Sequence, residues 1–155
     1  MRNLFSKAAA CIAVAGLLIA VPAQAQARES AEKLRKLDIM LMVTALRCRT
    51  TSSNFQSDFA DFEAAHLGEL NGAARDMKIG MLAEYGPRGV DRALDRVSTG
   101  MANQYGQGHP WLDCAELKSV TRSLAMMRGP EALEEAADQL LSSDGRGEQL
   151  AWARR

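Results

Sequence analysis

The hydrophobic residues of this chain recur at intervals of three and four, the spacing that places side chains on one face of an α-helix. Ser30 is a suitable N-cap for the first such segment. The polar run 50–54 favours a turn that ends it. The apolar positions between them are Leu34, Leu37, Leu41, Ala45 and Cys48. The pattern therefore predicts an amphipathic helix that begins after Ser30 and ends near Cys48.

A second apolar stripe follows the polar run and extends to Met81. Gly68, Gly72 and Gly80 interrupt it, and a glycine inside a helix costs about 1 kcal/mol relative to alanine. We therefore expect a bend or break near residues 68–72. The clearest break is the Tyr-Gly-Pro-Arg-Gly segment at 85–89. The stripe consists of Phe55, Phe59, Phe62, His66, Leu70, Ala73, Met77 and Met81.

Three more stripes predict three more helices. The third helix ends near Tyr105, Pro110 is suited to be the first residue of the fourth, and Gly129-Pro130 separates the fourth from the fifth. No segment alternates with period two, as a half-buried strand would. The fold class is therefore all-α, a compact bundle of about four to five antiparallel helices. The stripes are Val90, Leu94, Val97 and Met101; Trp111, Cys114, Leu117, Val120, Leu124 and Met127; and Leu133, Ala136, Ala137, Leu140 and Leu141.

The N-terminus has the pattern of a cleavable signal peptide. Arg2 and Lys7 precede an apolar run at 8–21, which is shorter than the roughly 20 residues of a membrane-spanning helix, and Ala23-Gln24-Ala25 forms a small-x-small cleavage site. We expect residues 1–25 to be removed and the product to be periplasmic or secreted. Residues 26–141 would then form a helical domain, and 142–155 a loosely ordered tail that could dock through Trp152.

The charge balance argues against polyanionic partners. The 155-residue chain has 19 basic and 19 acidic side chains, and loss of Arg2 and Lys7 with the signal peptide leaves 17 basic against 19 acidic. Nucleic acids and anionic membranes are bound by clustered Lys and Arg. We therefore expect binding to neither nucleic acids nor anionic membranes, and the short apolar run at 8–21 predicts no membrane anchor.

The cysteines predict one disulfide. Cys11 lies in the signal peptide, so Cys48 and Cys114 are the pair that reaches an oxidising compartment. Their separation excludes the Cys-x-x-Cys arrangement of redox-active thiols. A bond between them requires α-carbons roughly 4.4–6.8 Å apart, so the end of the first helix would lie beside the start of the fourth.

This bond would gather a set of polar and aromatic side chains, our candidate binding site. One interpretation is a pocket in which arginines hold an anionic group and Trp111 forms an aromatic wall. The other is structural: the arginines and Asp113 offset the helix dipoles, and Trp111 belongs to the core. The candidate binding residues are Arg47, Arg49, Asn103, Tyr105, His109 and Trp111.

The sequence lacks the motifs of catalysis and of cofactor binding. Its two histidines are His66, on an apolar face where a core histidine is expected, and His109. We predict no metal site and no cofactor. Neither a Gly-x-Ser-x-Gly elbow nor a phosphate-binding glycine loop is present. We therefore predict no catalytic residues; an enzyme acting on the cell envelope would have to use His109 with Asp113 or a nearby Glu.

Three segments, Leu41–Arg49, Met101–Gly106 and Pro110–Cys114, resemble a group of small exported proteins of Gram-negative bacteria. The resemblance covers most of the mature domain and implies export and paired cysteines. Some members carry the label S-adenosylhomocysteine hydrolase, an activity that implies a large dinucleotide-binding fold. The chain has neither the Gly-x-Gly-x-x-Gly turn nor the length for that fold, so we expect no such activity.

Three functions follow in order of preference. The first is a non-enzymatic periplasmic binding or interaction protein, such as a small chaperone, inhibitor or accessory subunit, with Leu67, Leu82 and Trp152 as exposed apolar contacts. The second is a small-molecule carrier or sensor with a pocket near the disulfide. The third is a cell-envelope enzyme. The expected partner is a protein or a small-molecule ligand of the cell envelope.

Overall fold

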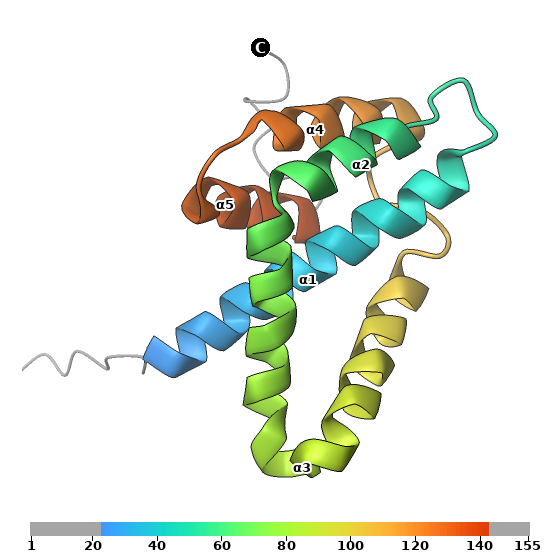
Figure 1. The fold of residues 1–155 in the computed structure, drawn as a ribbon. Helices are drawn as coiled ribbons and strands as arrows, with labels where there is room; N and C mark the ends of the chain where they lie inside the picture. The colour runs from blue at the N-terminus through green and yellow to red at the C-terminus, as the bar shows by residue number, and fades with distance from the viewer. Residues whose placement is uncertain (1–22, 143–155) are drawn as a thin grey trace, which may run out of the picture.

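The computed structural model describes residues 23–142, which form five α-helices and no strand within that range (Figure 1). Helix α1 contacts each of the other four, and α2 packs against α4. The predicted all-α bundle is therefore confirmed. No helix of this range is long and apolar enough to cross a membrane. The helices are α1 (Ala23–Cys48), α2 (Gln56–Ala65), α3 (Leu67–Gln104), α4 (Cys114–Met126) and α5 (Pro130–Leu141).

The core is built from the apolar stripes of the sequence. On α1, Leu37, Met40 and Leu41 are fully buried, because this helix is covered on several sides by the others. The prediction that His66 is a core residue is confirmed, since it is 1% exposed. The largest fully buried side chains are Phe55, Phe62, Leu37, Met40, Leu41, Leu117, Leu124, Leu133, Leu140, His66, Val90 and Val120.

Helix α3 is bent into two arms, residues 67–85 and 87–104, which we call the α3 hairpin. Gly86 has φ 64° and ψ 172°, a conformation open essentially to glycine alone, and Pro87 then begins the second arm without a backbone N–H. Lys78 and Asp91 form an ion pair between the arms. The predicted break at 85–89 is confirmed. The turn of the hairpin projects away from α2, α4 and α5 (Figure 1).

Two predicted helix boundaries in the first half of the chain are wrong. Helix α1 begins at Ala23, because the residues before Ser30 are mostly good helix formers; Ser30 lies inside it and its hydroxyl donates to Glu134 on α5. The break expected at 68–72 occurs at His66, whose N–H donates to the carbonyl of Phe62 while its own carbonyl accepts from Leu70. One residue thus closes α2 and opens α3.

The predicted start of the fourth helix at Pro110 is also wrong. Helix α4 begins at Cys114, because Asp113 forms a capping box with Glu116. Asp113 Oδ1 accepts from the backbone N–H groups of Ala115 at 2.8 Å and Glu116 at 2.9 Å, and Glu116 Oε2 accepts from the N–H of Asp113 at 2.9 Å. This arrangement satisfies donors that are otherwise unpaired at a helix start. Pro130 does open α5, as predicted.

The predicted signal peptide and tail fall mostly outside the described residues. Residues 1–22 include the apolar run, and residues 143–155 include Trp152. Signal-peptide removal and docking of Trp152 therefore stay predictions.

Candidate functional site

The disulfide joins the two predicted cysteines. Cys48 is the last residue of α1 and Cys114 the first of α4, with an S–S distance of 1.99 Å and α-carbons 5.8 Å apart. The predicted pairing and the predicted α-carbon range are both confirmed. The loop 105–113, which leads into Cys114, is thereby held close to the end of α1.

Three aromatic side chains of the candidate site come together in this loop, and we call them the aromatic cluster: Tyr105, His109 and Trp111. The Tyr105 and His109 rings are stacked, with centroids 6.2 Å apart and planes inclined by 16°. The His109 and Trp111 rings meet edge to face at 4.7 Å. Tyr105 is buried, and the other two are half-buried. The cluster is therefore a packed unit, with the histidine at its centre.

The ring nitrogens of the cluster fasten the loop to the end of α5. His109 Nε2 lies 2.9 Å from the carbonyl oxygen of Leu140, which can only accept, so Nε2 carries the proton. His109 Nδ1 accepts from the backbone N–H of Leu112 at 3.2 Å. Trp111 Nε1–H donates to the carbonyl of Ser142 at 3.4 Å. These bonds need a neutral imidazole, so His109 acts as a structural connector in this state.

The remaining candidate residues lie at the margin of the cluster. Arg47 Nη1 donates to the carbonyl of Gly106 at 3.5 Å and passes close to Gly108, where an added Cβ would lie 3.2 Å from Arg47 Nε. Arg49, which follows the end of α1, instead donates to the carbonyl of Leu46 in the last turn of that helix at 3.5 Å, and Asn103 is exposed. The structure thus brings together Arg47 and the aromatic cluster, and leaves Arg49 and Asn103 outside it.

The geometry of this site matches the structural interpretation more closely than the ligand pocket. Both ring nitrogens of His109 are hydrogen-bonded to backbone, and Asp113 caps α4, so neither is placed as an acid or base for a substrate. No group of three or more His, Cys, Asp or Glu in residues 23–142 is placed to hold a metal ion. A ligand bound here would have to replace existing hydrogen bonds, which costs free energy.

Acid should weaken the attachment of the loop. Burial lowers the pKa of His109 below its ordinary value, against an opposing contribution from the Leu140 carbonyl and from Glu116. The folded state therefore prefers the neutral ring. The contribution of neutral His109 to the free energy of unfolding is fully present above about pH 6.5, the pKa of an unperturbed histidine. That contribution is lost as the pH falls from there towards the lower pKa of His109 in the folded state. We expect the urea concentration at the unfolding midpoint of the wild type to be lower at pH 5 than at pH 7.5.

A glutamine at position 109 provides the matched control for this pH effect, because its amide can donate and accept but does not titrate. His109→Gln should therefore show a smaller fall of the urea midpoint over the same pH range. An equal fall in both proteins would mean that other groups cause the acid sensitivity.

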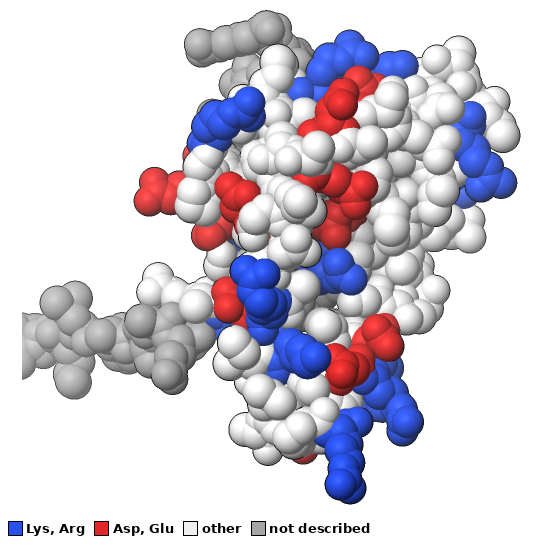
Figure 2. All heavy atoms as spheres, in the orientation of Figure 1, with Lys and Arg blue, Asp and Glu red and all other residues white. Residues whose placement is uncertain are grey.

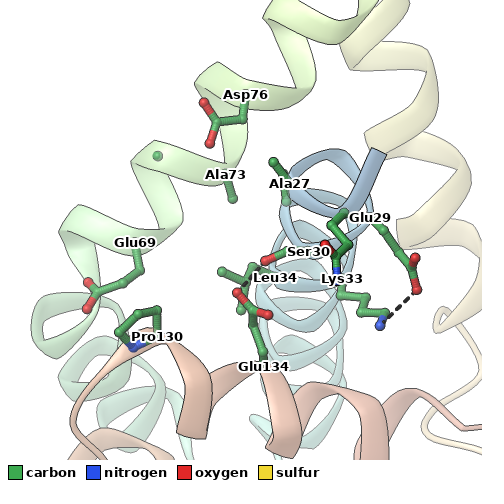
Figure 3. A pocket seen from close by; sticks show the side chains of 13 residues that line it. Ala27, Glu29, Ser30, Lys33, Leu34, Glu69, Ala73, Asp76, Pro130 and Glu134 are labelled. Carbon is green, nitrogen blue, oxygen red and sulfur yellow. Dashed lines mark hydrogen bonds and ion pairs between the residues drawn. The ribbon is translucent and has the colours of Figure 1, made fainter. Parts of the chain in front are cut away.

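Sequence reasoning missed a cavity on another side of the molecule. It lies between the first half of α1, the first arm of the α3 hairpin and the start of α5, and has a volume of about 610 Å³ (Figure 3). Its only signal in the sequence is a set of small residues on helices that cross, such as Ala27, Ala31 and Gly72. No cysteine, histidine or motif marks this place.

The chain was compared with protein-family models, with curated proteins and with solved structures, and none of them matches it. The function is therefore inferred from the placement of its own side chains.

Proposed function

We propose that this protein is a non-enzymatic binding protein of the periplasm that contacts a protein partner through the α3 hairpin. The observation that carries the proposal is the exposure of three large apolar side chains near the turn of the hairpin. Ile79 is 63% exposed, Tyr85 40% and Leu82 38%. Single exposed apolar residues are ordinary, but three within seven residues favour a contact surface.

The exposed residues are additional to those that hold the hairpin together. Met77, Met81 and Val90 supply the buried side of the two arms. Ile79 and Leu82 lie off that side, so the core of the bundle does not need them. Because the turn of the hairpin projects from the body of the molecule (Figure 1), a partner could reach these side chains without rearranging the fold.

The surface charge supports a protein partner over a polyanion. Basic and acidic side chains are interspersed over the face drawn in Figure 2, whereas nucleic-acid binding usually relies on a clustered basic patch. The disulfide supports a periplasmic location, because such bonds persist in oxidising compartments. The expected exposure of Leu67 and Leu82 is confirmed, at 59% and 38%.

The other candidate functions receive less support. A carrier with its pocket beside the disulfide would need available polar groups there, yet the ring nitrogens of His109 and Trp111 are bonded to backbone carbonyls or N–H groups. An envelope enzyme would need His109 and Asp113 to face a common substrate, and both serve local structure instead.

Site-specific photo-crosslinking tests the proposal. A photoreactive phenylalanine analogue is placed at position 79 or 82, with position 99 on the exposed part of the second arm as the matched control. In the periplasm of the producing cell we expect a discrete protein adduct from positions 79 and 82 and none from 99. Ile79→Ser combined with Leu82→Ser should abolish an adduct from position 85, while changing stability by less than about 0.5 kcal/mol.

Equal labelling from positions 79 and 99, or no adduct from any hairpin position, would overturn the proposal. The unfolding midpoint of each variant, measured in parallel, separates loss of the surface from loss of the fold.

A further inference from the structure

We propose that the cavity between α1, α3 and α5 is a binding site for a small organic polycation, an alkyl chain with several ammonium groups. This site goes beyond the proposed function, because Ile79, Leu82 and Tyr85 are not among the residues that line it. Figure 3 shows the cavity with α3 on one side, α1 on the other and α5 beneath it.

The cavity exists because the helices that border it carry small side chains. Ala27 and Ala31 on α1 face Gly72 and Ala73 on α3, so no large side chain fills the space. An added Cβ at Gly72 would meet only Arg75 Nη2, at 3.8 Å, which leaves room on this wall. The volume of about 610 Å³ is in the range of pockets that hold small molecules, roughly 300–1,000 Å³.

The polar part of the lining is mainly acidic. Its charged side chains are four carboxylates and a single cation, Lys33. Lys33 is already engaged, with Nζ 3.0 Å from Glu29 and 2.9 Å from Asp138, and these bonds raise its pKa, so that its charge is retained. Arg75 beside Gly72 and the α-amino group that cleavage would leave on Gln26 add positive charge at the edge of the cavity. The four carboxylates still outnumber the cations, so a cationic ligand would meet a favourable potential.

Three carboxylates are left for the ligand. Glu134 accepts the hydroxyl of Ser30 across the floor of the cavity (Figure 3) and keeps acceptor capacity, since a carboxylate has about four lone-pair sites. Glu69 and Asp76 project from α3 at the rim, and neither forms an ion pair within residues 23–142. Ammonium groups would donate to these oxygens, and such charge-assisted bonds are the stronger kind.

The spacing of the acidic groups favours an extended organic cation over a metal ion. A metal needs several ligand atoms converging on one point, and no such group occurs in the described range. The cavity also presents apolar surface from Leu34, Ala73 and Pro130, against which methylene groups can pack. An alkyl chain with separated ammonium groups matches both features.

Isothermal titration calorimetry of the mature protein with spermidine tests the site. We expect one spermidine per chain. Gly72→Leu, which fills the cavity, should weaken binding at least tenfold. Gly68→Leu is the matched control, because it lies one turn earlier on the same arm, does not line the cavity, and has no atom within 4 Å of its added Cβ. It should leave the affinity unchanged.

A second pair of variants tests the charge without altering the shape. Asp76→Asn should weaken spermidine binding several-fold, whereas Asp95→Asn on the second arm should not. The proposal would be overturned if the two variants of either pair lost spermidine affinity equally, or if Mg²⁺ gave the same heat as spermidine, because either result would indicate general counter-ion attraction. No heat at millimolar spermidine would mean that the cavity does not bind it. Ile79→Ser with Leu82→Ser should leave spermidine binding intact, so failure of the cavity and failure of the hairpin surface are distinguishable.

Discussion

Replacing both Cys48 and Cys114 with alanine is expected to lower the free energy of unfolding by about 4 kcal/mol. The bond closes a loop with a sequence separation of 66, and removing it restores the conformational entropy of that loop in the unfolded chain. Small domains have a total stability of about 5–15 kcal/mol, so the loss is a large share. Urea unfolding of the oxidised wild type and of the double variant measures the difference directly.

A reductant supplies the control for this prediction. Dithiothreitol should shift the urea midpoint of the wild type towards that of the double variant and leave the variant unchanged, because the variant has no bond to reduce. If oxidised and reduced wild type unfold at the same midpoint, the bridge does not restrict the unfolded chain as proposed. The loop 105–113 should also exchange its amide hydrogens faster in the variant, since Cys114 no longer holds the start of α4 to α1.

The elements that the sequence predicted well are those whose signal lies within a single helix. The apolar stripe of α1 is buried from Leu34 to Cys48, and the break at Gly86-Pro87 is present. Both follow from local physics, namely helical periodicity and the conformational limits of glycine and proline. The disulfide was predictable because only two cysteines follow the expected signal peptide.

The boundaries that failed depend on contacts between helices or on competing local signals. Ser30 has the chemistry of an N-cap, but its hydroxyl is used by Glu134, 104 positions away. Pro110 has the chemistry of a first helical residue, but the capping box of Asp113 and Glu116 sets the start of α4. In each case a suitable residue type was present, and a different set of hydrogen bonds decided its role.

The sequence predicted which side chains of the candidate site lie near the disulfide, but it did not predict the hydrogen bonds that these side chains form. The disulfide does place Arg47 near Tyr105, His109 and Trp111. The partners of the two ring N–H groups, however, are the backbone carbonyls of Leu140 and Ser142. Because every residue has a backbone carbonyl, the amino-acid sequence does not indicate which of them accepts these hydrogen bonds. The cavity was missed for a similar reason, because a space between crossing helices is defined by their three-dimensional arrangement.

Gly86→Ala is expected to lower the free energy of unfolding by about 1–3 kcal/mol, because alanine is strained at φ 64° and ψ 172°. An added Cβ at this position meets no atom within 4 Å, so the cost comes from the backbone alone. Gly100→Ala is the matched control: it is the same substitution on the same helix, in helical backbone and also without a neighbour within 4 Å. It should instead stabilise the protein by roughly 0.5–1 kcal/mol.

Gly86→Ala and Gly100→Ala are expected to change the free energy of unfolding in opposite directions, so comparing them tests the backbone conformation at the turn of the α3 hairpin. Urea midpoints of Gly86→Ala and Gly100→Ala would be measured side by side with the wild type. Because Gly86 sets the turn between the arms, its substitution should also weaken photo-crosslinking from position 79, while Gly100→Ala leaves it unchanged. If both variants shift the midpoint in the same direction, Gly86 does not have the positive-φ conformation on which the shape of the α3 hairpin depends.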